Sequence, residues 1–268
     1  MTDPGVTFDP TLTATHHERQ WILESLSDLY FDEWLLDVSY RVKGGKEATV
    51  YCCAAHPNTG LELLAAKVYR PRMFRAMKND AMYRDGRLRL DDSGKMIRDR
   101  RSWLAMKKGT RHGKRLRTTS WIQHEYQTLR RLHGAGADVP RPLVQSGTAM
   151  LMEYVGEAGY GAPTLHEVRL DADEARRVFG RLMENVELLL SCDLIHADLS
   201  AYNVLYWEGE FKIIDFPQTV NAMTNPSAFF LLSRDVERLC RYFAKYGIEA
   251  NAVELATNLW TRFTRAEL

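Results

Sequence analysis

Two aspartates and an asparagine near the middle of the chain are spaced for metal and phosphate chemistry. In the stretch "LIHADLSAYNVLYWEGEFKIIDFPQ", Asp198 lies in an expected loop, Asn203 follows five residues later, and Asp215 ends an expected apolar strand. Carboxylate and amide oxygens are the hard ligands that Mg²⁺ prefers, usually beside the phosphates of a nucleotide. Asn203 and Asp215 are therefore candidate metal ligands, and Asp198 is a candidate to accept the proton of an attacking hydroxyl.

The spacing of these residues is more specific than any one of them. The order His196-x-Asp198-x4-Asn203, followed by an apolar strand that ends in Asp215, matches the catalytic loop and metal-binding aspartate of kinases. Either aspartate alone would more often be a turn or cap residue. For His196 we expect a structural role, as a buried and hydrogen-bonded side chain.

A lysine and a glutamate far apart in the sequence are expected to form an ion pair. Lys67 ends the apolar strand "LLAAKVY", which is similar to the Val-Ala-Ile-Lys strand of kinases. Glu125 lies on the apolar face of a helix expected to begin at Ser120 and to end at Gly134. A buried carboxylate is costly unless a cation meets it. We therefore expect Lys67 to pair with Glu125 and to be held against nucleotide phosphates.

The stretch "KGGKEATVY", residues 43–51, lies where a phosphate-binding loop would be expected. It lacks the full G-x-G-x-x-G pattern, and two glycines alone would usually indicate a hairpin turn. Its position before the lysine strand, rather than its pattern, favours a nucleotide loop.

The expected elements predict an α+β fold of two lobes. Strands cluster before residue 155 and helices dominate after residue 160. The predicted parts are a helical extension at 1–36, a β-rich N-lobe at 37–155 and a reduced helical C-lobe at 156–268, which carries the catalytic and metal loops. Helices are expected at 16–36, 120–133, 172–191, 226–246 and 250–265.

Composition excludes some classes of protein. A chain of 268 residues with 45% hydrophobic residues suits one large domain or two lobes. No apolar run approaches the roughly 18 residues that a membrane-spanning helix needs. The four cysteines have no metal-ligand spacing, and the N-terminus resembles no secretory signal, so we expect no membrane partner and a cytoplasmic location.

Positive charge is concentrated in one segment. Residues 70–119 contain 17 lysines and arginines against 5 acidic residues, although the whole chain has a net charge of +1. This segment is expected to be a flexible basic insert. Contact with an RNA or another polyanion and a solvated insert that serves solubility are equally favoured.

At this point the sequence resembles the RIO family of atypical protein kinases over about residues 35–245. "GGKEATVY" is similar to the family's phosphate loop, "GYGAPTL" to its linker and "IIDFPQ" to its metal-binding loop. "HADLSAYNVLY" resembles its catalytic loop, with Ser200 where ordinary protein kinases carry a lysine. Most motifs resemble the first subfamily, whereas "DFPQ" is closer to the second. The sequence departs at Lys43 and Gly44, where hydroxyl residues are common.

The resemblance implies a two-lobed, protein-kinase-like fold that binds ATP and Mg²⁺, or Mn²⁺ in its place. It makes Asp198 the catalytic aspartate, with Lys67 and Ser200 in catalytic roles, and Asn203 and Asp215 the metal ligands. Met152 would be the gatekeeper, and Glu153 and Val155 would offer backbone groups to adenine. The residues expected to bind the nucleotide are Gly44, Gly45, Lys46, Glu47, Ala48, Val50, Lys67, Glu125, Met152, Glu153 and Val155.

The resemblance further implies a serine/threonine kinase or an ATPase, with autophosphorylation, a phosphorylated Asp215 and ribosome maturation as family associations. The acceptor would be a protein or the chain itself, and the basic insert 70–119 would contact ribosomal RNA or a pre-ribosomal particle. Two alternatives stay open. One is a small-molecule phosphotransferase of the aminoglycoside-kinase kind, and the other is a pseudokinase scaffold that binds nucleotide without turnover.

Overall fold

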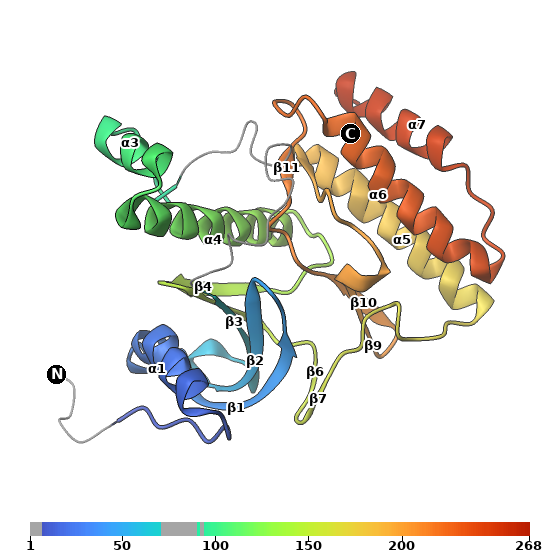
Figure 1. The fold of residues 1–268 in the computed structure, drawn as a ribbon. Helices are drawn as coiled ribbons and strands as arrows, with labels where there is room; N and C mark the ends of the chain where they lie inside the picture. The colour runs from blue at the N-terminus through green and yellow to red at the C-terminus, as the bar shows by residue number, and fades with distance from the viewer. Residues whose placement is uncertain (1–6, 71–89, 92–93) are drawn as a thin grey trace. The chain divides into compact units, whose positions relative to one another are not determined.

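The computed structural model describes residues 7–70, 90–91 and 94–268 (Figure 1). Part of the predicted basic insert therefore lies outside the described residues. The described chain divides into two compact units. The first contains 7–70, 90–91, 94–126 and 141–161, and the second contains 127–140 and 162–268.

Helices and strands follow one another in an order close to that expected. The first unit contains α1 (His16–Phe31), β1 (Leu35–Gly44), β2 (Ala48–Ala55), η1 (Pro57–Thr59), β3 (Leu63–Tyr69), α3 (Arg100–Lys108), β4 (Pro142–Ser146), β5 (Ala149–Glu153), β6 (Gly156–Glu157) and β7 (Tyr160–Gly161). The long helix α4 (Arg111–Gly134) begins in the first unit and ends in the second. The second unit continues with α5 (Ala172–Ser191), β8 (Leu194–Ile195), η3 (Ala201–Asn203), β9 (Val204–Trp207), β10 (Glu210–Ile213), β11 (Val220–Asn221), α6 (Ala228–Phe243), η4 (Ala244–Tyr246) and α7 (Ala252–Thr264).

A five-stranded antiparallel sheet of order β1-β2-β3-β5-β4 organises the first unit. Side chains alternate between the two faces of a strand. On β3 the alternate residues Leu64, Ala66 and Val68 are buried in a core that also includes Leu26 and Leu29 of α1. The helix α1 therefore covers this face of the sheet.

The opposite face of the sheet carries three of the candidate nucleotide residues. Lys67 of β3 is paired in register with Val50 of β2 and with Met150 of β5. Met152 pairs with Ala65, two residues before Lys67, and so projects to the same face. The register thus groups Val50, Lys67 and Met152 on the face away from α1.

The first helix ends earlier than the sequence indicated. α1 stops at Phe31 rather than at residue 36 because Glu33 adopts a positive φ of 59°, and β1 then begins at Leu35. A positive φ in a non-glycine residue is uncommon and interrupts a right-handed helix.

Most of the described part of the basic segment is helical. α3 ends at Lys108 and is followed by the cap residue Gly109, whose φ is 67°. α4 begins at Arg111, nine residues before the expected start at Ser120. The Thr110 hydroxyl accepts a hydrogen bond from the amide of Gly113 and satisfies one free donor at this helix start. Ser120 lies inside α4, where its hydroxyl accepts from the amide of Leu90 at 2.9 Å.

Three long helices dominate the second unit. α5, α6 and α7 lie side by side (Figure 1) and are in mutual contact. α5 is capped by Asp171, whose carboxylate accepts from the amides of Asp173 and Glu174. The antiparallel pair β9–β10 and the short pair β8–β11 hold the loops that contain the candidate catalytic residues.

Two expectations about the chain as a whole can be compared with the described residues. All four cysteines, which lie within the described ranges, are buried and form no disulfide. Within the described ranges, no helix is both long and apolar enough to cross a membrane.

The close contact of α3 with α4 depends on Gly113. A Cβ atom at this position would lie 1.9 Å from the carbonyl oxygen of Ala105. We expect Gly113→Ala to force α3 away from α4 at a cost of about 1–3 kcal/mol. Amide hydrogen exchange should accordingly become faster over 100–108. Gly134→Ala in the same helix meets no atom within 4 Å and is the matched control. Unchanged exchange in Gly113→Ala would contradict this packing.

Candidate active site

In the first unit, Lys67 and Glu125 form the ion pair expected from the sequence. The Lys67 ammonium lies 2.6 Å from Glu125 Oε1, and the side chains are 12% and 2% exposed. Tyr69, two residues along β3, donates its hydroxyl to Glu125 Oε2 at 2.6 Å. Both oxygens of this buried carboxylate are therefore bonded, which offsets much of its cost of burial. The pair fixes the direction of the Lys67 side chain.

The expected phosphate loop is a tight connection between β1 and β2. The amide of Gly45 donates to the carbonyl of Ala48 at 2.8 Å, and a Cβ at Gly45 would lie 3.0 Å from that same oxygen. Lys46 is exposed and Glu47 is half-buried. The carbonyl of Glu47 accepts from the amide of Arg70, three residues after Lys67. The loop is thus tied to the end of the lysine strand.

The residues expected to contact adenine differ in whether their backbone amide and carbonyl groups are already hydrogen-bonded. Met152 is 9% exposed on β5. The amide of Glu153 is already used, because it donates to the carbonyl of Arg141 at 2.8 Å. The Glu153 carboxylate in turn accepts from the Arg141 amide at 3.0 Å. Val155 makes no hydrogen bond to any residue that the structure describes, so its backbone groups are open.

In the second unit, a buried histidine joins the catalytic loop to the metal loop. His196 is 1% exposed, and its Nδ1 accepts from the amide of Asp198 at 3.3 Å. The proton therefore resides on Nε2, which donates to the carbonyl of Ile214 at 3.1 Å. Burial lowers the pKa of the imidazole and keeps it neutral. Ile214 directly precedes Asp215, so the expected structural role of His196 is to connect these two segments.

Asn203 makes a second connection between the same segments. Its side-chain amide donates to the carbonyl of Asp198 at 2.9 Å, and its backbone carbonyl accepts from the amide of Ile214 at 2.9 Å. Asp215 follows with a φ of 72°, a conformation that aspartate tolerates better than most residues. The structure thus brings the backbones that carry Asp198, Asn203 and Asp215 together through a short chain of hydrogen bonds.

The donor set suits a hard cation. Because the Asn203 nitrogen is bound to the loop, its Oδ1 is turned away, and no described residue donates to it. An amide oxygen and the Asp215 carboxylate are ligands of the kind that Mg²⁺ takes together with phosphate oxygens. Across the described residues, no group of three His, Cys, Asp or Glu side chains is placed to hold a metal.

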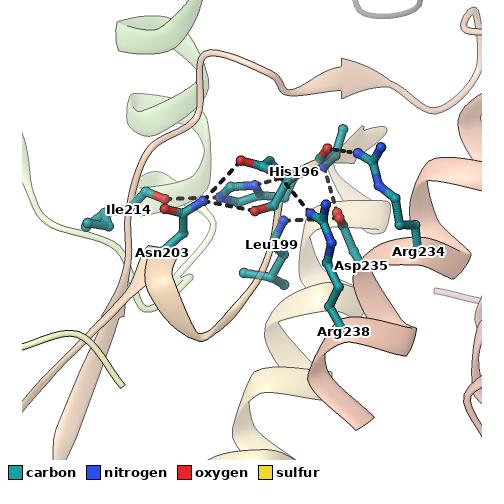
Figure 2. Close-up of polar contacts among 9 residues, drawn as sticks. His196, Leu199, Asn203, Ile214, Arg234, Asp235 and Arg238 are labelled. Atoms are coloured by element: carbon teal, nitrogen blue, oxygen red, sulfur yellow. Dashed lines mark hydrogen bonds and ion pairs between the residues drawn. The ribbon is translucent and has the colours of Figure 1, made fainter. Parts of the chain in front are cut away.

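A buried carboxylate that the sequence analysis missed holds the catalytic loop. Asp235 of α6 is 2% exposed and accepts from the amides of Ala197 at 2.7 Å and Leu199 at 3.1 Å. These amides flank Asp198. Arg234 donates to the carbonyl of Ala197, which has a positive φ of 64°. Figure 2 shows Arg234, Asp235 and the loop residue Leu199 converging from helix and loop. The signal in the sequence was a single acidic residue on the apolar face of α6.

The remaining candidates occupy open positions. Asp198 Oδ1 lies 2.8 Å from Arg238 Nη1, and the Asp198 side chain is 46% exposed. Ser200 is half-buried at the start of η3, and its carbonyl accepts from the amide of Asn203. Its hydroxyl makes no hydrogen bond to a residue in the described ranges. Its predicted catalytic role stays a prediction.

Asp235 predicts a loss of stability as the pH rises through neutrality. Burial raises the pKa of its carboxyl from 3.8 to about 7, although the two amide donors and the charges of Arg234 and Arg238 act in the opposite direction. Between these values the folded chain holds a proton that the unfolded chain has lost. The free energy of unfolding should therefore fall as the pH rises from about 4 to about 7.5.

Urea unfolding of the wild type and of Asp235→Asn across this pH range measures the effect. We expect the variant to be less stable throughout and to lose this part of the pH dependence. Asp193→Asn, at an exposed aspartate that also pairs with an arginine, is the control and should keep the wild-type slope. Parallel curves for the wild type and Asp235→Asn would show that Asp235 does not titrate in this way.

Comparisons with known proteins identify relatives among protein kinases. A family model described as "RIO domain" matches residues 49–256. A serine/threonine-protein kinase RIO1 from Caenorhabditis elegans is 27% identical over 225 residues, covering 82% of this chain and 39% of that protein. A RIO-type serine/threonine-protein kinase Rio1 from Haloferax volcanii is 28% identical over 216 residues, covering 80% of this chain and 66% of that protein. The chain spans less than half the length of the nematode relative.

The fold is also that of a solved kinase. The crystal structure of a Rio2 kinase–ADP/Mg²⁺–phosphoaspartate complex from Chaetomium thermophilum matches with a TM-score of 0.58 at 20% identity, covering 87% of this chain and 64% of that chain. The predicted α+β kinase-like fold, with a β-rich and a helical part, is confirmed.

The family match includes the candidate residues of both units. Lys67, Glu125, Asp198, Asn203 and Asp215 all lie between residues 49 and 256, whereas the glycines of the phosphate loop lie just before this range. Since the match covers well over half of its residues, this chain belongs to the RIO family.

Proposed function

We propose that the chain transfers the γ-phosphoryl group of ATP, with Mg²⁺, as a RIO-type serine/threonine kinase or ATPase. The observation that carries this proposal is the fixation of Asp198. Its flanking amides are bound by Asp235, its own amide by His196, and its carbonyl by Asn203. Phosphoryl transfer depends mainly on such positioning and on charge stabilisation, with little covalent work by the protein.

The roles of the other candidates follow from the same chemistry. In this proposal Lys67, aligned by Glu125, binds the nucleotide phosphates. Asn203 Oδ1 and the Asp215 carboxylate hold Mg²⁺, which neutralises charge on the transferred group when bound. Gly44 and Gly45 approach the phosphates closely because they carry no side chain. Val155 and Met152 contact the adenine.

The acceptor is a protein side chain, the chain itself or water. The similar Rio2 structure is described as containing a phosphoaspartate. We propose Asp215 as the corresponding phosphorylated residue if the main activity is ATP hydrolysis. Ribosome maturation, an association of the family, is the setting proposed for either activity. Family membership favours these acceptors over an aminoglycoside, and a turnover assay separates both from a pseudokinase.

Asp198→Asn tests the proposed reaction. Incubation with γ-labelled ATP and Mg²⁺ should transfer label to serine, to aspartate or to free phosphate in the wild type. Because Asn203, His196 and Asp235 hold the backbone rather than the carboxylate, the variant should still bind ATP. Its turnover should fall about 100-fold or more, since the acceptor proton has lost its carboxylate. Wild-type turnover in Asp198→Asn would refute the role.

A control variant and two added reagents make this assay more specific. Asp193→Asn makes the same change at an exposed aspartate five residues earlier and should keep full turnover. Hydroxylamine releases label from an acyl phosphate and not from phosphoserine, so it separates the two covalent products. Added aminoglycosides should not accelerate release of label, and an acceleration would favour the small-molecule phosphotransferase.

The exposed positive charge of α3 and α4 favours a second function, binding to ribosomal RNA. Several side chains here are exposed and close in sequence, namely Lys107, Lys108, Arg111, Lys114 and Arg115. The two helices approach closely at Gly113, so these charges lie on adjacent helices. Lysine and arginine contacts to phosphates release counterions, which makes such binding sensitive to salt.

Charge reversal tests this second function. The triple variant Lys107→Glu, Lys108→Glu, Lys114→Glu should weaken RNA binding at moderate salt. The slope of log K against log salt should become shallower by about 1 for each phosphate that the variant no longer neutralises. Arg176→Glu with Arg241→Glu, on exposed arginines of α5 and α6, is the control. An unaltered slope in the triple variant would remove the proposal.

A further inference from the structure

The candidate general base has a cation as its direct neighbour. Arg238 Nη1 lies 2.8 Å from Asp198 Oδ1, and the two side chains are 34% and 46% exposed. Arg238 follows Asp235 by three residues on α6, so both side chains are on the face of the helix that meets the loop, as Figure 2 shows. One turn of α6 therefore holds both the backbone of the loop and the carboxylate that it carries.

The catalytic loop contains no positive charge of its own. The stretch "HADLSAYN", residues 196–203, has neither lysine nor arginine, and Ser200 stands where ordinary protein kinases carry a lysine. Among the described residues, Arg238 forms no hydrogen bond or ion pair other than that with Asp198. Its remaining N–H groups are open. An arginine is always charged, so its effect on the loop is permanent rather than switched by pH.

The two oxygens of Asp198 have different surroundings. Oδ1 is bound by Arg238, whereas Oδ2 lies 3.5 Å from the side-chain nitrogen of Asn203, at the outer limit of a hydrogen bond. Oδ2 is therefore the oxygen left for an acceptor hydroxyl. In phosphoryl transfer this oxygen mainly orients the attacking hydroxyl.

We propose that Arg238 is a positioning residue that supplies the missing cation of the catalytic loop. This inference rests on the proposed phosphoryl transfer. Arg238 holds Oδ1 so that Oδ2 receives the acceptor proton while the bond from the acceptor oxygen to the γ-phosphorus forms. The bond from that phosphorus to the ADP oxygen breaks in the same step. The guanidinium also balances the negative charge that Asp198 brings toward the phosphoryl group.

The test compares Arg238→Gln and Arg238→Lys with the wild type in steady-state transfer from γ-labelled ATP. We expect kcat to fall about 100-fold in Arg238→Gln, because the carboxylate is misplaced, while KM for ATP changes little. Arg238→Lys keeps the charge but not the planar fork and should recover part of the rate. Arg241→Gln, one turn further along α6, is the matched control and should keep the wild-type rate.

A double-mutant cycle separates positioning from a general loss of structure. Because Arg238 acts through Asp198, Arg238→Gln should add almost no loss in an Asp198→Asn background. A further loss of the full size there, a wild-type rate in Arg238→Gln, or an effect on KM alone would overturn the inference. If the wild type itself transfers no phosphoryl group, the proposed function fails. That result is distinguishable from failure of the Arg238 inference, because it is seen before any variant is tested.

Discussion

The geometry of the candidate site depends on one buried carboxylate. Asp235 accepts the amides on either side of Asp198 and so fixes the backbone that carries the expected catalytic aspartate. This bond pattern also offsets the unusual φ of Ala197, which would be costly in a loop without support. Burial removes water from the Asp235 carboxylate and raises its pKa to about 7, because the charged form is less stable in the protein interior than in water.

In the first unit a buried carboxylate also orients a functional side chain, here through an ion pair. Lys67 must present a charge on one face of a sheet whose other face packs against α1. A buried Glu125, bonded to both Lys67 and Tyr69, holds that charge in a single direction. In both units a nearly inaccessible acidic residue orients a more exposed functional group. Because the carboxylates of Asp235 and Glu125 are buried, few alternative hydrogen-bond partners are available to them, and each contact keeps one geometry.

Much of this arrangement follows from local patterns in the sequence. The apolar spacing of 172–191 predicts α5 with both ends, and an inward Glu125 predicts its pairing with a lysine. The roles of Asp235 and Arg238 were not predicted, because their partners lie about 40 residues away and only tertiary packing brings them together. The start of α4 was also missed, since the charged residues before Ser120 mask a helix that is stabilised by its contact with α3.

We propose that Asn203 and Asp215 bind a metal that holds the nucleotide phosphates, and calorimetric titration with ADP tests this proposal most directly. In the wild type, ADP should bind much more tightly with Mg²⁺ than with a chelator. Asp215→Asn, which tolerates the same backbone conformation, should lose that difference while Asp193→Asn keeps it. Equal ADP affinity with and without Mg²⁺ in the wild type would contradict the account.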